Sequence, residues 1–204
     1  MSYDPKRHRR RSIRLKGYDY SQVGGYFITV VTQNRESRFG AVVDGVMQLN
    51  NAGAMVQEAW EAMPVHYLGV EIDAFVVMPN HLHGVIILAG PNTRGCSETE
   101  GTGKPPATGH PQRVAKTLSL PDVVHRFKSL TTGRYLAGIR ENGWPAVSGR
   151  LWQRNYFEHI IRDERALNLI REYIAMNPGQ WEYDRENPDR TKSPPEGAPQ
   201  AWQT

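Results

Sequence analysis

The amino-acid sequence predicts a mixed fold of strands and helices within one domain of ordinary size. Two apolar segments, 70–78 and 82–88, meet at the turn dipeptide Pro79-Asn80 and are expected to form a β-hairpin. Two other segments, 51–63 and 165–176, repeat their apolar residues at helical spacing. With 204 residues, 39% of them hydrophobic, the chain is long enough to bury a core between these elements.

Local signals predict the elements before and within this hairpin. Residues 26–32 are rich in β-branched and aromatic side chains and predict a strand. Alternating apolar residues over 40–49 indicate a second, short hairpin. Asn50 or Asn51 is expected to cap the next helix, and Pro64 to end it. The apolar composition of both strands of the main hairpin predicts central strands that are buried on both faces.

The chain after the hairpin divides by composition. Residues 89–113 are dominated by Gly, Pro, Thr and Ser and predict a long flexible loop. Ser119-Leu120-Pro121-Asp122 is a helix start with an acid at the capping distance. Residues 152–161 predict a strand, and Asn177-Pro178 should end the last helix. We therefore expect a basic arm over 1–20, a folded domain over 21–181 and a flexible tail over 182–204.

The net charge and the cysteine content indicate the kind of partner and the cellular compartment. A net charge of +4 and a pI near 9.3 permit a nucleic-acid partner. The single cysteine, Cys96, excludes a disulfide within the chain and predicts a reducing compartment. Because no apolar segment follows the basic N-terminus and none is long enough to span a membrane, we expect a cytoplasmic protein. The basic arm is either a solvated tail or a phosphate-binding segment, and its cations are Lys6, Arg7, Arg9, Arg10, Arg11, Arg14 and Lys16.

Two histidines at the start of the second hairpin strand are candidate metal ligands. Side chains alternate between the faces of a strand, so His81 and His83 should point the same way. Two neighbouring imidazoles can bind one divalent cation. The alternative is that one histidine caps the turn and the other is a hydrogen-bonded core residue.

A tyrosine and an amide on the last helix form a second candidate pair. Tyr173 and Asn177 lie four residues apart and are neighbours across one helical turn. A phenolate can attack phosphorus and hold a phosphoryl group covalently, although a tyrosine at this position is also typical of core packing. The amide oxygen of Asn177 would complete a ligand set for Mg²⁺ or Mn²⁺.

Six motifs in their order along the chain resemble the REP-associated tyrosine transposases, relatives of the single-tyrosine transposases of small bacterial insertion sequences. His81-Leu82-His83 matches their His-hydrophobic-His (HUH) metal motif. Tyr173 and Asn177 match their Tyr-x-x-x-Gln or Tyr-x-x-x-Asn motif, with Asn in place of the Gln of the insertion-sequence branch. The six motifs span residues 11–20, 26–29, 75–84, 127–129, 152–159 and 173–178.

This resemblance implies a fold, an activity and a substrate. The fold would be a ferredoxin-like α+β antiparallel sheet with helices packed on one face and the site on the other, and residues 21–181 would be its catalytic domain. The activity would be cleavage and joining of single-stranded DNA near hairpins through a 5′-phosphotyrosine, with Mg²⁺ or Mn²⁺ and in a monomer or homodimer. The DNA contacts would be Arg9, Arg10, Arg11, Arg14, Lys128 and Arg154.

Two other functions are compatible with the same residues. One is a non-catalytic module that binds hairpin DNA. The other is a metallohydrolase unrelated to DNA, in which Asp73 or Glu158 joins the histidine pair. A second tyrosine, Tyr156, competes with Tyr173 for the role of nucleophile, but it lies in a predicted strand, where packing or stacking on a base is the expected role.

Overall fold

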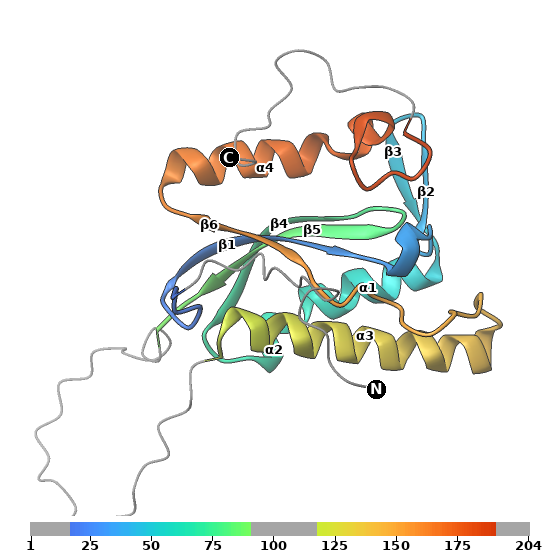
Figure 1. Cartoon of the computed structure of the whole chain (residues 1–204), viewed down its shortest axis with the longest axis horizontal. Helices are drawn as coiled ribbons and strands as arrows, with labels where there is room; N and C mark the ends of the chain where they lie inside the picture. Colours follow the sequence, from blue (N-terminus) through green and yellow to red (C-terminus); the bar gives the residue numbers. More distant parts are fainter. Residues whose placement is uncertain (1–16, 91–117, 191–204) are drawn as a thin grey trace, which may run out of the picture.

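The computed structural model describes residues 17–90 and 118–190, and its centre is a four-stranded antiparallel sheet (Figure 1). The strand order is β4-β5-β1-β6. The strands are β1 (Gly24–Val31), β4 (Val70–Val77), β5 (His81–Leu88) and β6 (Phe157–Ile161). Helices connect β1 to β4 and β5 to β6, so the fold is the expected ferredoxin-like α+β arrangement.

Helices cover both faces of the sheet. Three helices lie on one face: α1 (Asn51–Glu61), α2 (Met63–His66) and α3 (Leu120–Asn142) (Figure 1). The helix α4 (Glu164–Met176) crosses the opposite face. The expected packing of helices on one face therefore describes α1 to α3, whereas α4 shares the face of the functional site. Between β1 and α1 the chain forms η1 (Gln33–Arg35) and a short hairpin of β2 (Gly40–Val43) and β3 (Val46–Leu49). The short helix η2 (Pro178–Tyr183) follows α4.

Alternation along β1 produces two cores. Tyr26, Ile28 and Val30 point into the larger core with α1 and α3. Phe27 points to the other face, where it belongs to a smaller cluster with Val85, Ile170 and Ile174. The apolar residues Ile170 and Ile174 of α4 thus pack against the two central strands, β1 and β5.

The helix starts agree with the sequence signals. The side chain of Asn50 accepts a hydrogen bond from the backbone N–H of Gly53 at 2.9 Å and caps α1. Ser119 and Asp122 form the expected capping box at the start of α3. Asp163 caps α4 through the N–H of Ala166 at 2.7 Å.

Several predicted elements differ in detail. The strand β4 lies at the edge of the sheet rather than in its centre, and α4 shields part of one of its faces. Pro64 lies in the first turn of α2 and does not end α1, because proline is tolerated where a helix has no N–H to bond. The strand predicted over 152–161 reduces to β6, and Trp152 makes only an isolated bridge with Thr32.

The boundaries of the folded domain also differ from those predicted. Tyr20, assigned to the arm, packs beside Tyr26, and its carbonyl accepts a hydrogen bond from Leu120 at 2.9 Å. Asp184 and Glu186, assigned to the tail, are buried. The folded domain therefore includes residues on both sides of 21–181. Residues 1–16, 91–117 and 191–204, which hold most of the predicted arm, loop and tail, lie outside the described part. No helix in the described part is long and apolar enough to cross a membrane.

Candidate metal and nucleophile site

The two histidines of β5 lie side by side on the α4 face of the sheet, as the strand alternation predicts. His81 pairs with Val31 of β1, and His83 with Thr29. Their ring centroids are 4.4 Å apart. Exposure is 0% for His81 and 4% for His83, so neither imidazole is a surface group.

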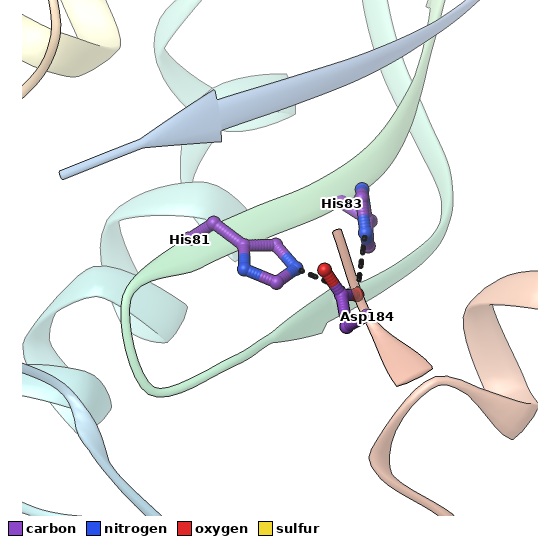
Figure 2. A group of neighbouring side chains, drawn as sticks. All are labelled: His81, His83 and Asp184. Carbon is purple, nitrogen blue, oxygen red and sulfur yellow. Dashed lines mark ion pairs between the residues drawn. The ribbon is translucent and has the colours of Figure 1, made fainter. Parts of the chain in front are cut away.

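Asp184 is the third member of the site and comes from the segment after η2 (Figure 2). Its Oδ2 lies 3.7 Å from Nε2 of His81 and 3.8 Å from Nε2 of His83. One ligand atom from each residue lies within 4.8 Å of the others. The sequence did not single out Asp184, because the same polar stretch also contains Glu182, Glu186 and Asp189.

Hydrogen bonds orient both imidazoles. Nδ2 of Asn80 donates to the carbonyls of Arg35 at 2.9 Å and Glu186 at 2.7 Å. Oδ1 of Asn80 is thus the acceptor for Nδ1–H of His81 at 2.8 Å, and the lone pair of His81 lies on Nε2, toward Asp184. Nδ1 of His83 is hydrogen-bonded to the hydroxyl of Thr29 at 2.8 Å, which fixes the orientation of this ring.

The charges of the site favour a bound cation. Burial, with a contribution from His83, lowers the pKa of His81 to about 3, so His81 is a neutral donor at pH 7. Burial alone would raise the pKa of Asp184, but interactions with His83 and His81 outweigh it and hold that pKa below its usual range. A buried carboxylate therefore faces the neutral imidazole of His81 and the neighbouring imidazole of His83.

Two polar atoms near this carboxylate lack partners. Nε2 of His81 and Oδ1 of Asn177 are buried without a hydrogen bond to any described residue. Nδ2 of Asn177 donates to Oδ2 of Asp184 at 3.2 Å, which keeps the amide beside the group. Orphaned buried acceptors are rare in folded proteins. A nitrogen and oxygen donor set with such orphans fits a divalent metal ion.

Tyr173 brings a hydroxyl to the same point. It lies on α4 between Ile170 and Ile174, and its hydroxyl is 3.2 Å from Nε2 of His83. The ring of Phe27 meets it edge to face at 6.0 Å. Burial and the charge of Asp184 raise the pKa of Tyr173 above its ordinary value, so the group is a neutral phenol at pH 7.

Contacts of Glu186 anchor the segment that carries Asp184. The backbone N–H of Glu186 donates to Oδ1 of Asp184 at 2.6 Å. Its carboxylate pairs with Nε of Arg35 at 2.8 Å and Nε of Arg185 at 3.3 Å. Together with the bond from Asn80, these contacts fix the position of Asp184 relative to the histidine hairpin.

A cavity of about 330 Å³ opens beside Tyr173 and His83. Its walls come from β1, from the segment before β6 and from the segment after η2. Beyond Tyr173 and His83, the lining residues are Phe27, Thr29, Val31, Arg35, Gln153, Asn155, Tyr156, Phe157, Asp184, Arg185 and Glu186. The predicted nucleophile thus borders a space that is open to a ligand.

The other predicted site residues have different positions. Nζ of Lys128 donates to the carbonyls of Gln153, Arg154 and Asn155 at 2.6, 3.3 and 3.4 Å, so this ammonium group supports a loop. Arg154 is exposed. Arg9, Arg10, Arg11 and Arg14 lie outside the described residues.

The alternative ligands and the alternative nucleophile are also located. Both carboxylate oxygens of Asp73 pair with the guanidinium of Arg171, at 2.8 and 2.7 Å. Neither Asp73 nor Glu158 belongs to the group of possible metal ligands found among the described residues. Tyr156 lies before β6, not in a strand, and lines the cavity.

Comparisons with known proteins agree with this architecture. No family model matches the chain. An uncharacterised protein of Haemophilus influenzae is 40% identical over 190 residues, which cover 90% of this chain and 96% of that protein. A second Haemophilus influenzae protein, provisionally assigned as a REP-associated tyrosine transposase, is 25% identical over 165 residues, covering 81% of this chain and 76% of that protein.

Among solved structures, a REP-associated tyrosine transposase bound to a REP hairpin has a similar fold. It superimposes with a TM-score of 0.50 at 20% identity, covering 84% of this chain and 74% of that chain. The motifs, the ferredoxin-like sheet and these relatives agree with one another. The chain is therefore similar in sequence and in fold to REP-associated tyrosine transposases.

Proposed function

We propose that this protein is a metal-dependent endonuclease and strand transferase that acts on single-stranded, hairpin-containing DNA. One observation carries the proposal: the Tyr173 hydroxyl lies 3.2 Å from Nε2 of His83, within a buried His-His-Asp group. A tyrosine hydroxyl beside a cation site suits metal-assisted phosphoryl transfer. The hairpin bound to the related solved protein supports the choice of substrate.

The cation would be Mg²⁺ or Mn²⁺, held by His81, His83 and Asp184. Oδ1 of Asn177 is a further candidate ligand because it is buried and has no partner among the described residues. Oxygen ligands suit both cations, and the two imidazoles favour Mn²⁺. When bound, the cation would polarise a non-bridging oxygen of the scissile phosphate.

The protein side chains would position and supply the nucleophile. Tyr173 attacks phosphorus, the P–O3′ bond breaks, and a 5′-phosphotyrosine and a free 3′-hydroxyl result. The 3′-hydroxyl of another strand then displaces Tyr173 and restores the phosphodiester. The packing of α4 through Ile170 and Ile174 positions the phenol beside His83 for this attack.

The remaining DNA contacts are proposed on charge. Arg9, Arg10, Arg11, Arg14 and Arg154 would contact phosphates. Lys128 would act indirectly, because its ammonium group is engaged by three carbonyls of the loop before β6. The protein would act on this DNA substrate in the cytoplasm.

The test is a trapping experiment. The wild-type protein, Tyr173→Phe and Tyr156→Phe are incubated with a panel of single-stranded hairpin DNAs and Mn²⁺, and covalent protein–DNA adducts are separated under denaturing conditions. Wild type and Tyr156→Phe should form the adduct, and Tyr173→Phe should not. Hairpin binding by wild type without any adduct would refute the proposal in favour of a non-catalytic DNA-binding module.

A further inference from the structure

An ion pair between Asp73 and Arg171 joins α4 to the edge strand β4, and the cleavage chemistry does not use it. We infer that these two residues are positioning residues, which hold α4 in the rotation that brings the Tyr173 hydroxyl to His83. The inference rests on the proposed function for the reaction that this position serves. Neither Asp73 nor Arg171 lines the cavity beside Tyr173, so their effect on the reaction would act through α4.

An irregularity in β4 turns Asp73 toward α4. The pairing of β4 with β5 shifts in register between Ile72 and Phe75. Both of these residues pack against the larger core, although regular alternation along a strand would place them on opposite faces. The irregularity lets Asp73 and Ala74 both lie on the α4 face, where Asp73 meets Arg171 and Ala74 packs against the smaller cluster.

Two hydrogen bonds fix the direction of the ion pair. Nε and Nη2 of Arg171 donate to Oδ1 and Oδ2 of Asp73 at 2.8 and 2.7 Å. The backbone N–H of Ala74 also donates to Oδ1 at 2.7 Å and orients the carboxylate on its own strand. The hydrogen bonds from Arg171 are the main cause that holds the pKa of Asp73 below its ordinary value, so the carboxylate is charged at pH 7. A bidentate pair of this kind restricts orientation as well as distance.

Arg171 and Tyr173 leave α4 on opposite flanks of its apolar side. Successive residues of a helix are about 100° apart, so Arg171 lies about 100° from Ile170 in one sense and Tyr173 about 60° in the other. Ile170 packs against the sheet, Arg171 reaches the β4 edge, and Tyr173 reaches His83 and the cavity. Because apolar packing is non-directional, the directed bonds of Arg171 add a constraint on rotation of α4 about its axis.

A small rotation of α4 would be enough to displace the nucleophile. A group about 6 Å from the axis of a helix moves by about 1 Å when the helix rotates by about 10°. A misplacement of about 1 Å can lower a reaction rate about 100-fold. The side chains of Arg171 and Asp73 are 41% and 19% exposed, and a pair this exposed contributes little to stability. We therefore expect its loss to lower the rate of the reaction more than it destabilises the fold.

The position of the phenol can be measured without any activity. A fluorinated tyrosine is incorporated at position 173, and its fluorine NMR signal is recorded without cation or DNA. The ring of His83, whose centroid lies 5.1 Å from that of Tyr173, makes this signal sensitive to displacement of the phenol. Asp73→Asn, which keeps an oxygen for the N–H of Ala74, and Arg171→Gln should each shift the signal. The double variant should shift it no further than either single variant, because the two residues act as one unit.

The rate of adduct formation is the second readout. With Mn²⁺ and saturating hairpin DNA, either single variant should form the adduct about 10- to 100-fold more slowly than the wild type. DNA affinity and melting temperature should be nearly unchanged. Arg171→Lys keeps the charge but not the two parallel hydrogen bonds, and should recover only part of the rate. The matched controls are Arg165→Gln and Glu172→Gln, which remove exposed charges from the same helix and should change neither the signal nor the rate.

The two readouts allow this inference and the proposed function to fail separately. An unshifted signal in Asp73→Asn and Arg171→Gln would overturn the inference even if the wild type forms the adduct. A shifted signal with a wild-type rate of adduct formation would also overturn it, because the displacement would then not matter to the reaction. A signal that shifts in both variants but in neither control supports the positioning of Tyr173 even if the wild type forms no adduct, a result that would refute only the proposed function.

Discussion

Replacement of Asn80 by alanine should weaken both the cation site and the fold. Asn80 is fully buried and makes three hydrogen bonds of 2.7 to 2.9 Å, to His81, Arg35 and Glu186. Its loss leaves three polar groups without this partner, at about 1 kcal/mol or more each. About 3 kcal/mol corresponds to a decrease in melting temperature of about 6–12 °C for a chain of this size.

The effect on cation binding follows from the tautomer of His81. Without Oδ1 of Asn80, no side chain holds the hydrogen on Nδ1, and Nε2 no longer presents its lone pair to Asp184. Loss of such an outer partner weakens metal binding by about 10–100-fold. Calorimetric titration with Mn²⁺ at a temperature where all variants are folded measures this change.

Two variants separate the orientation of the His81 imidazole from the anchoring of the segment that carries Asp184 and Glu186. Asn80→Asp keeps an oxygen for Nδ1–H of His81 but cannot donate to the carbonyls of Arg35 and Glu186. It should lose stability yet bind Mn²⁺ more tightly than Asn80→Ala. Asn168→Ala, which removes an exposed asparagine of α4, is the matched control and should change neither quantity. Wild-type Mn²⁺ affinity in folded Asn80→Ala would refute the tautomer argument.

Three further predictions concern the cation, pH and DNA. Asp184→Ala should abolish the increase in melting temperature that Mn²⁺ gives the wild type, whereas Asp189→Ala, an exposed acid, should retain it; equal responses would exclude Asp184 as a ligand. Because the pKa of His81 falls from 6.5 to about 3 on folding, its contribution to stability is complete above about pH 6.5 and is lost as the pH falls toward 3. Denaturant unfolding of His81→Gln should therefore show a weaker pH dependence in that range, and an unchanged one would contradict the burial argument. Deletion of residues 1–16 should weaken DNA binding and reduce the slope of log affinity against log salt, and an unchanged slope would identify the arm as a solvated tail.

Local signals predicted most elements of the fold because they act over a few residues. The capping groups Asn50 and Ser119 mark helix starts in the structure as they do in the sequence. The edge position of β4 was not predictable in this way, since its composition resembles that of a central strand. Shielding by α4, which is distant in sequence, explains how an apolar strand is tolerated there.

The site was predictable only in part, for a related reason. His81, His83 and Tyr173 are recognisable because the chemistry of each is reinforced by a neighbour at strand or helix spacing. Asp184 has no such neighbour in the sequence. It lies beside His81 and His83 only because the segment after η2 packs next to the histidine hairpin. The contacts of Lys128 could not be predicted either, because its partners are backbone carbonyls, which no sequence pattern displays.

Strand register and helix spacing together explain why the site lies on the α4 face. Thr29 pairs with His83, so this histidine shares a face with Phe27 and points away from the core with α1 and α3. Phe27 also belongs to the cluster that contains Ile170 and Ile174. Helical spacing places Tyr173 on the same side of α4 as these two residues, so its ring packs against this cluster. A register shift of one residue in β5 would turn both imidazoles into the opposite core and place Leu82 on the α4 face. The hydrophobic pattern that stabilises the sheet therefore also holds the histidines opposite the tyrosine.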